Sequence, residues 1–413
     1  MAQPSRRAVV SLLLAAPAAA LLGCTATAAD ANATVRAATS TPTGATASLG
    51  SPAGLPQGPL ANAGFGPNGS HWPSRTPRPS DRFDLVVEAE CNWGAIGKAI
   101  AYVTERTTEG KGAVLVKPGT LPGNGAGSSS TPVLQLVGQA DRSYRVLVAP
   151  RDGSGSVTHT GSLRIDRVKG VSFVGFWPFP NSVVLTSVED VAWAWSKGQA
   201  FNVTAGKGGP ARRIELVECV TPELKITESD AWAFRTAGSA LEDVAVVGCY
   251  VAPSYKPAGS AAHCDTLQLS GDKPQTTVTV RDSVIFASTN AAFIPSAIAA
   301  GVMFDHSLVV GGDRMLQRFP VPPEANAFTS GFPSAVNGSG TVGILSARNS
   351  TFIGPVRGEW ATVESTTVSG SNLARSATGG FTSDPSLSSI DATWLEKVTP
   401  VPTDERLRAV WAL

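Results

Sequence analysis

The sequence predicts an all-β fold in which short strands are wound into a solenoid. Strand-like runs with a similar profile recur along the chain, and they begin at Val171, Val191, Ile214, Val244, Val278, Val302 and Gly343. Each run starts with alternating apolar residues, passes through two small or polar residues and resumes with one or two apolar ones. The runs start 20, 23, 30, 34, 24 and 41 residues apart, and steps in the twenties match one coil of a β-solenoid. The longer steps indicate loops inserted into a coil.

A second short run follows several of these strands. It begins at Asp230, Asp265, Asn290 and Asp313, and it places apolar side chains at its third and usually its fifth position. Because side chains of a strand alternate between two faces, these positions point into the coil, while the second, fourth and sixth point outside. We therefore expect at least two stacked strands in each coil, separated by tight polar turns.

Both ends of the repeat region have a different pattern. Residues 93–107 carry Ile96, Ile100 and Val103 at helical spacing, and an amphipathic helix at this place would cover the open end of the solenoid core. The last segment, residues 388–413, returns to mixed spacing. We expect this segment to cap the other end.

The order of this helix, two glycines and the strand AVLVKPGT resembles the start of right-handed parallel β-helix proteins of the pectate-lyase-like superfamily. The resemblance covers roughly residues 83–367. It implies a right-handed parallel β-helix over residues 83–387 with an N-terminal capping helix. It also implies sites on the outer wall, where neighbouring strands lie about 4.8 Å apart. The repeat encodes stacking, so the resemblance does not specify a reaction.

The N-terminus predicts export. Residues 1–24 combine Arg6 and Arg7 with an apolar run that is too short to span a bilayer, as in a signal peptide. The residues Leu-Leu-Gly-Cys that end at Cys24 are similar to the bacterial lipobox, and Ser-Arg-Arg is similar to the start of a twin-arginine signal. The resemblance implies lipidation at Cys24 and membrane contact through an acyl anchor only. We expect the protein on the outer face of the cytoplasmic membrane, or secreted.

Composition, charge and cysteine content narrow the remaining expectations. Residues 25–82 are rich in Ala, Thr, Ser, Pro and Gly, which predicts a disordered linker. The net charge is +1, and loss of Arg6 and Arg7 gives 1 − 2 = −1, so no global charge favours nucleic acid. No cysteine has zinc-site spacing. Cys219 and Cys249 hold matched places in successive runs and predict a buried cysteine ladder. We expect a monomer.

The stretch SAAHCDTLQLSG carries the first candidate site. His263 and Asp265 lie at i and i+2, and Thr266 and Gln268 offer further polar atoms along the outside. The fragment HCDTLQ is similar to a His-x-Asp-x-x-Gln pattern of some exported β-helix proteins, to which no single reaction belongs. Histidine can act as acid or base near neutral pH. We take His263 and Asp265 as candidate catalytic residues and Thr266 and Gln268 as substrate-binding ones; a structural histidine in a turn is the alternative.

Cationic residues surround this stretch in the predicted coils. Arg235, Arg314 and Arg318 hold outward positions, and Lys225 and Lys256 lie in adjoining loops, the latter beside Tyr255. If they cluster, they form a cationic strip suited to a uronic-acid polymer. We assign Lys256 and Arg314 to catalysis and Arg235, Arg318 and Tyr255 to substrate binding. A plain solvated surface is the alternative.

Carboxylates at equal places of the second run suggest a metal site. Asp230, Asp265 and Asp313 would form a ladder at the coil spacing and could bind calcium, a hard cation that prefers oxygen ligands. Asp and Asn also favour turns, because their side chains bond local backbone N–H groups. No cofactor is therefore certain, and calcium is the one candidate.

Three functions remain open at this point. A lyase needs cations or calcium to neutralise the uronate and a base to remove the α-proton. A glycoside hydrolase needs two carboxyls, which Asp230 with Asp265, or Asp265 with Asp313, would supply. The Asn-Thr-Asp, Asp-Asp, Gly-His-Gly and Arg-x-Lys elements of polygalacturonase-like hydrolases are not seen, which favours the lyase. A non-catalytic glycan-binding or adhesive lipoprotein would use the same cationic strip without turnover.

Overall fold

The computed structural model describes residues 65–413 apart from 126, 128–129, 296–298, 327–332, 370–373 and 401. The expected signal peptide, the lipidation site Cys24 and the linker up to residue 64 lie outside the described residues. Within the described part of the chain, no helix is both long and apolar enough to cross a membrane.

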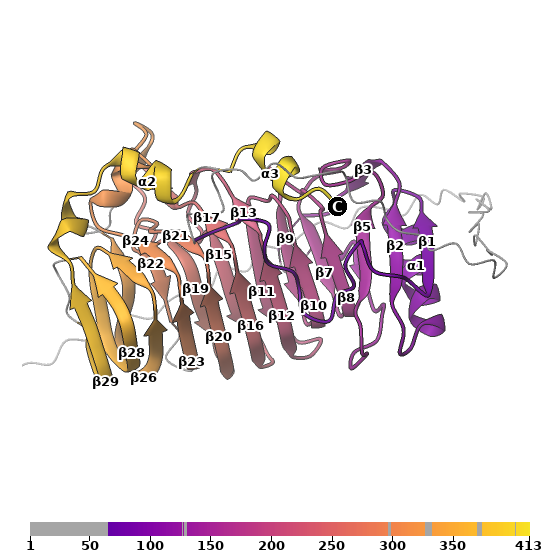
Figure 1. Cartoon of the computed structure of the whole chain (residues 1–413), viewed down its shortest axis with the longest axis horizontal. Helices are drawn as coiled ribbons and strands as arrows, with labels where there is room; N and C mark the ends of the chain where they lie inside the picture. Colours follow the sequence, from indigo (N-terminus) through magenta and orange to yellow (C-terminus); the bar gives the residue numbers. More distant parts are fainter. Residues whose placement is uncertain are drawn as a thin grey trace, which may run out of the picture. The chain divides into compact units, whose positions relative to one another are not determined.

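The predicted parallel β-helix is confirmed, because each coil pairs in parallel with the coil before and after it (Figure 1). The first row of stacked strands contains β1 (Leu85–Ala89), β2 (Gly112–Val116), β5 (Val146–Pro150), β8 (Lys169–Val174), β10 (Glu189–Ala194), β12 (Ala211–Val217), β16 (Leu241–Val247), β20 (Gln275–Arg281) and β23 (Ala299–Asp305). The second row contains β13 (Val220–Thr221), β17 (Tyr250–Val251), β21 (Val284–Phe286), β24 (Leu308–Val310) and β27 (Thr351–Ile353).

The third row is the one that carries the candidate site. It contains β4 (Leu134–Gln135), β7 (Leu163–Asp166), β9 (Ser182–Thr186), β11 (Ala200–Ala205), β15 (Trp232–Thr236), β19 (Asp265–Gly271) and β22 (Ala291–Ile294). The long strands β26 (Ser334–Arg348) and β28 (Val356–Val368) continue both the third and the first row, and β29 (Arg375–Ser383) pairs with β28. Two small sheets join β3 (Gly119–Pro122) to β6 (Val157–Thr160), and β14 (Lys225–Ile226) to β18 (Ser254–Pro257) and β25 (Ala325–Asn326).

The apolar alternation seen in the sequence builds the core. Val171 pairs with Val191, which pairs with Ile214, and the same register continues coil by coil. These side chains are almost fully buried, because each stacks on its equivalent in the next coil. Equivalent inward positions therefore form continuous apolar ladders, which explains why the runs share one profile.

The corner between the first and second rows uses the left-handed backbone conformation. Glu218, Asp282 and His306 hold it with φ of 53°, 51° and 46°, and a small inward residue follows each of them. The N–H of Cys219 donates to Sγ of Cys249 at 3.4 Å, and the N–H of Cys249 donates to Oγ of the serine at 283 at 3.0 Å. Both cysteines are buried and unbridged, so the predicted cysteine ladder is confirmed.

The expected N-terminal capping helix is present. Helix α1 (Trp93–Arg106) begins at Asn92, whose side chain accepts from the N–H of Ala95 at 2.7 Å. Its buried face includes Ile96, Ile100 and Val103, the residues that predicted the helix, and this face packs against β1 and β2 (Figure 1).

The last part of the linker expected over residues 25–82 makes specific contacts with the coils. Residues 65–78, which we call the strap, lie across the corner of the coils, from the ring of Phe65 stacked on His306 to Arg75 paired with Asp190. Asp190 and Glu218 are fully buried carboxylates, and the strap supplies cations to both. The strap is rich in Gly, Pro and Ser, so its sequence resembles that of a linker and does not indicate these contacts.

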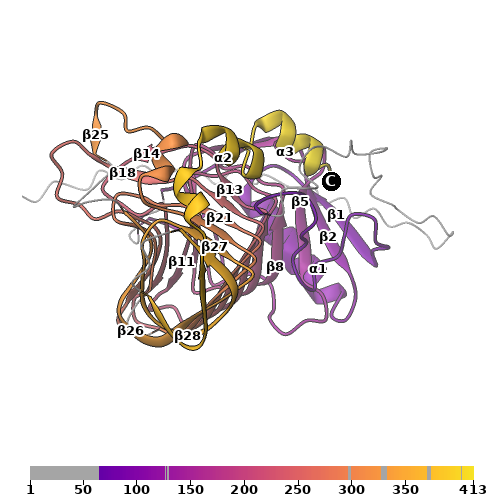
Figure 2. The ribbon, with the colours of Figure 1, turned by 60° about the vertical axis from the view of Figure 1, so that its left-hand side comes forward.

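The C-terminal segment does not cap the far end. After the short helix η3 (Pro385–Ser389), α2 (Ala392–Val398) and α3 (Asp404–Val410) run back along the flank of the coils (Figures 1 and 2). Lys197 donates to Oδ1 of Asp404 at 2.5 Å, and the ring of Trp411 stacks on that of Trp195. Trp411 is therefore buried against the flank of the coils.

Candidate functional site

A groove of about 1120 Å³ runs over the third row of strands. Outward side chains of β7, β9, β11, β15 and β19 form its floor, because these strands are stacked in register. One line of floor positions runs from Asp166 through Thr186, Thr204 and Arg235 to Ser270. The groove thus crosses successive coils, as a site for an extended polymer must.

The lining of the groove is cationic. It contains five cations, Arg164, Arg167, Lys207, Lys225 and Arg235, and two carboxylates, Asp166 and Asp230, which gives 5 − 2 = +3. Each carboxylate is held by an arginine: Asp166 lies 2.8 Å from Arg167, and Asp230 lies 3.0 Å from Arg235. The other lining residues are small or carry hydroxyl or amide groups, and none of them is aromatic. The groove therefore offers charge and hydrogen bonds rather than stacking surfaces.

A short ladder of polar side chains lies beside the groove. The N–H of Asp265 donates to Oδ1 of Asp230 at 3.1 Å, and Nδ2 of Asn290 donates to Oδ1 of Asp265 at 2.9 Å. Asp265 is only 1% exposed. Burial raises the pKa of its carboxyl to about 7, and the negative charge of Asp230 adds to this, while the hydrogen bond from Asn290 opposes it. The expected alignment is confirmed for Asp230 and Asp265, because Trp232 pairs with Leu267. It is one residue off for Asn290, because Asp265 pairs with Ala291.

Asp313 does not belong to this ladder. It precedes the short helix η2 (Arg314–Gln317), and Ser334 at the start of β26 takes the place next to Ala291. An inserted segment, residues 311–333, lies between β24 and β26 in the sequence. Within the described part of the chain, no three His, Cys, Asp or Glu side chains lie together in a way that could hold a metal ion.

Two of the predicted site residues lie in the groove and a third is next to it. Arg235 and Asp230 line it, and Gln268 is half-buried with its Nε2 3.5 Å from Oδ2 of Asp265. His263 is exposed at the end of the preceding loop, and no described residue forms a hydrogen bond or ion pair with it. The structure therefore brings Asp230 and Arg235 together in the groove and leaves His263 outside its lining.

Three other candidates are buried by their coil. Thr266 is fully buried, and its hydroxyl lies 2.7 Å from that of Ser288. The hydroxyl of Tyr255 donates to the backbone oxygen of Phe319 at 2.7 Å, and Lys256 is 5% exposed between β14 and β25. The insert before Asp265 thus forms the small sheet instead of covering the groove.

Arg314 and Arg318 belong to a different surface. Arg318 pairs with Glu396 of α2, and Arg314 pairs with Asp313 at 2.5 Å and donates to the backbone oxygen of Ile390 at 3.4 Å. Their expected strand is the helix η2, which packs against the C-terminal segment. Neither residue lines the groove.

Sequence reasoning missed the cations at the other end of the groove. Arg164 lies on β7 and Arg167 follows it, and Lys207 lies in the turn after β11. The strands LRID and AFNVTA carry the period-2 signal, with Arg164 and Asn202 on the outward side. Alignment of these short runs with DAWAF would have identified the groove floor.

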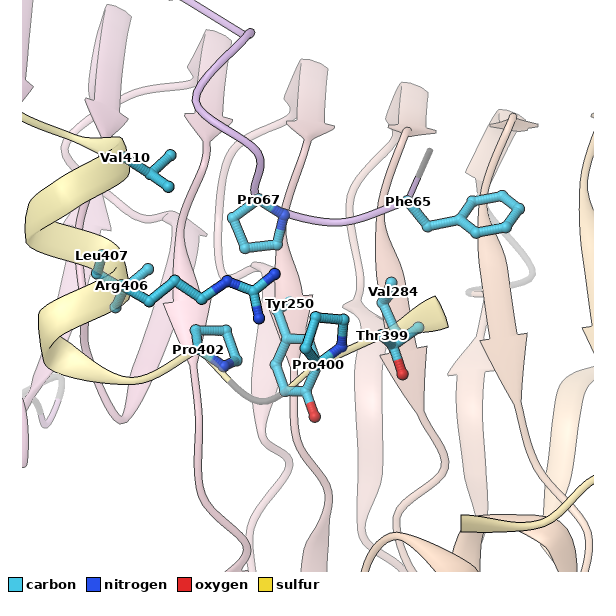
Figure 3. Close-up of a pocket in the computed structure, with 10 residues that line it drawn as sticks. All are labelled: Phe65, Pro67, Tyr250, Val284, Thr399, Pro400, Pro402, Arg406, Leu407 and Val410. Carbon is cyan, nitrogen blue, oxygen red and sulfur yellow. The ribbon is translucent and has the colours of Figure 1, made fainter. Parts of the chain in front are cut away.

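A smaller pocket lies where the strap meets the C-terminal segment (Figure 3). Phe65 and Pro67 of the strap line this pocket together with Tyr250, Pro400 and Arg406. This contact joins the two ends of the described chain and is separate from the groove.

No protein-family model and no curated protein matches the chain. Among solved structures, it is similar to the A-module of the mannuronan C-5 epimerase AlgE6 of Azotobacter vinelandii. That match has 14% sequence identity and a TM-score of 0.24, and it covers 71% of this chain and 95% of the other. Because this TM-score is low, we draw no conclusion from the match. The fold follows from the parallel pairing of the coils.

Proposed function

We propose that the groove binds an acidic polysaccharide and that the protein cleaves it by β-elimination. The observation that carries this proposal is the lining of the groove, with a net charge of +3 over five stacked strands. An extended polyanion would lie across the coils and meet cations along its length. Such binding is electrostatic and falls as the salt concentration rises.

The side chains in the groove disfavour other polymers. Proteins that bind single-stranded nucleic acid stack its bases on aromatic side chains, and no aromatic residue is among the described residues that line this groove. Neutral glycans would bring no anionic groups to the cations of this lining. A polymer of uronic acids fits the chemistry of the lining better than either.

Elimination fits the carboxylates better than hydrolysis does. A two-carboxylate hydrolase needs both groups at the glycosidic bond. Asp265 is buried behind Asp230, and the carboxylates that line the groove are each held by an arginine. Elimination instead requires a cation beside the uronate carboxylate to stabilise the charge that develops there, and Arg235 can take this role.

The test is the ultraviolet absorbance of the unsaturated product during incubation with a panel of acidic polysaccharides. Arg235→Gln is compared with Arg314→Gln, because Arg314 lies outside the groove. We expect product with the unchanged protein and with Arg314→Gln, and a loss of at least about tenfold with Arg235→Gln. We also propose calcium as a cofactor. Parallel reactions with added calcium or with a chelator test this proposal separately, by comparing the rates of product formation. Salt-sensitive binding without product would replace the lyase with a non-catalytic glycan-binding protein.

We also propose that the protein is exported and held at the membrane surface by an acyl chain on Cys24. The support is the N-terminal sequence alone. Cys24→Ser in the full chain is expected to move the protein from the membrane fraction to the soluble fraction. An unchanged distribution would remove the anchor from the proposal.

A further inference from the structure

Few groups in the groove can remove a proton from a bound sugar. Arginine keeps its proton at any relevant pH, which excludes Arg164, Arg167 and Arg235 as bases. The lining carboxylates, Asp166 and Asp230, are already engaged by arginines. Two lysines, Lys207 and Lys225, remain among the titratable residues that line the groove.

The two lysines differ in how the fold holds them. Lys207 is exposed in the turn after β11. Lys225 lies on β14, where it pairs with Ser254 of β18 and donates its N–H to the backbone oxygen of Pro253 at 3.1 Å. Its side chain is half-buried in the groove wall, and no described residue forms an ion pair or side-chain hydrogen bond with it. The backbone of Lys225 is therefore held by the small sheet, while its side-chain amine is available to a bound sugar.

The surroundings of Lys225 favour its neutral amine. Burial lowers the pKa of Lys225 below its ordinary value, because an ammonium ion is poorly solvated there. Asp230 and Arg235 line the groove with Lys225, and they compensate each other in their ion pair. A lysine in such surroundings can act as a general base.

We infer that Lys225 is the base that removes the α-proton of the uronate bound beside Arg235. This inference rests on the proposed elimination and adds the identity of the base. The neutral amine takes the proton from C5, the C–H electron pair forms the C4–C5 double bond, and the bond from C4 to the glycosidic oxygen breaks. The departing oxygen takes a proton from water in the open groove. The lysine ammonium then returns its proton to solvent, so charge and atoms balance.

The test compares three substitutions in the full chain. Lys225→Met removes the amine and keeps the length of the side chain, whereas Lys225→Arg keeps the charge but cannot lose the proton. Lys207→Met removes a cation from the same groove without removing the inferred base. Lys98→Met, at an exposed position of α1, serves as the folding control.

We expect kcat to fall at least about 100-fold in both Lys225 variants, with polymer affinity retained in Lys225→Arg. Lys207→Met should mainly raise KM. In the unchanged protein kcat should rise with pH as Lys225 loses its proton, and this rise should be absent in Lys225→Arg. A kcat that survives in Lys225→Met overturns the inference while leaving the lyase intact. No product from the unchanged protein overturns the lyase and the inference together.

Discussion

Asp265 donates its backbone N–H to Oδ1 of Asp230 at 3.1 Å, so aspartates of successive coils lie in contact beside the groove. The outer carboxylate is balanced by Arg235, and the inner one has amide donors but no cation of its own. The inner carboxyl therefore takes up a proton far more readily than an ordinary aspartate does. The consequences can be measured without knowing the substrate.

Asp265→Asn should stabilise the protein at neutral and alkaline pH. The pKa of Asp265 is raised from 3.8 to about 7, so its stabilising contribution is complete below about pH 3.8 and is lost as the pH rises through about 7. Asparagine avoids the buried charge and keeps an oxygen for Asn290. At about 1.4 kcal/mol per pKa unit, we expect a gain of a few kcal/mol near pH 8 and almost none near pH 4.

Denaturant unfolding at both pH values measures this difference. Asp166→Asn is the matched control, because it removes an ion pair with Arg167 and leaves Asp265 unchanged. Equal stability of Asp265→Asn and the unchanged protein near pH 8 would contradict the argument.

His71→Gln should weaken the protein at low pH and much less at high pH. Burial alone would lower the pKa of His71, but hydrogen bonds to Asp282 and Glu218 outweigh it and raise the pKa from 6.5 to about 9. The ion pairs thus contribute stability that is complete below about pH 6.5 and is lost as the pH rises through about 9. Thermal unfolding between about pH 6 and pH 10 should show this slope, and glutamine should flatten it.

His306→Gln provides the comparison for His71. His306 also lies beside Asp282, at 2.7 Å, but its side chain is 43% exposed. We expect a smaller loss from this change, because water screens an exposed pair. A slope that stays the same in His71→Gln would show that the strap is held by its other contacts.

The coils could be predicted from the sequence because their cause is local. Alternating Val, Ile, Phe and Trp residues recur at each coil, and the spacing of Ile96, Ile100 and Val103 marks the capping helix. The strap could not be predicted in this way. Its ion pair between His71 and Glu218 joins residues 147 positions apart. Residues 65–78 have no periodic pattern that would indicate Glu218 as the partner of His71.

The candidate site was predictable where the register is regular. Asp230, Asp265 and Arg235 hold their places because β15 and β19 pair in an unbroken register. Arg314 and Arg318 were misplaced because a run such as DRMLQ has the apolar spacing of a strand, yet it forms η2 in an inserted segment. Alternation assigns a face only after the strand is known to belong to the row.

Removal of the strap should destabilise the protein strongly. A chain that begins at Asp81 would leave the buried carboxylates of Glu218 and Asp190 without His71 and Arg75. Loss of one partner of a buried pair costs about 3 to 5 kcal/mol, although Arg145 still holds Asp190 at 2.8 Å. We expect a much lower midpoint in denaturant than for a chain that begins at residue 61.

The C-terminal segment should loosen in the same truncated chain. Phe65 and Pro67 pack beside Pro400 and Arg406 (Figure 3), and Nε1 of Trp411 donates to Glu218 at 3.2 Å. Hydrogen exchange of α3 reports on this contact. Unchanged protection of α3 and an unchanged midpoint would mean that the strap merely lies on the surface.

Cys249→Ser should be tolerated, whereas Cys249→Ala should not. The N–H of Cys219 donates to the sulfur of Cys249, and the equivalent position one coil further holds the hydroxyl of Ser283. A serine at 249 extends a ladder that the next coils already build from hydroxyls. Alanine leaves the buried N–H of Cys219 without an acceptor, which costs about 1 to 3 kcal/mol. Equal midpoints of the two variants in denaturant would show that stacking of the coils, rather than this ladder, sets the stability of the corner.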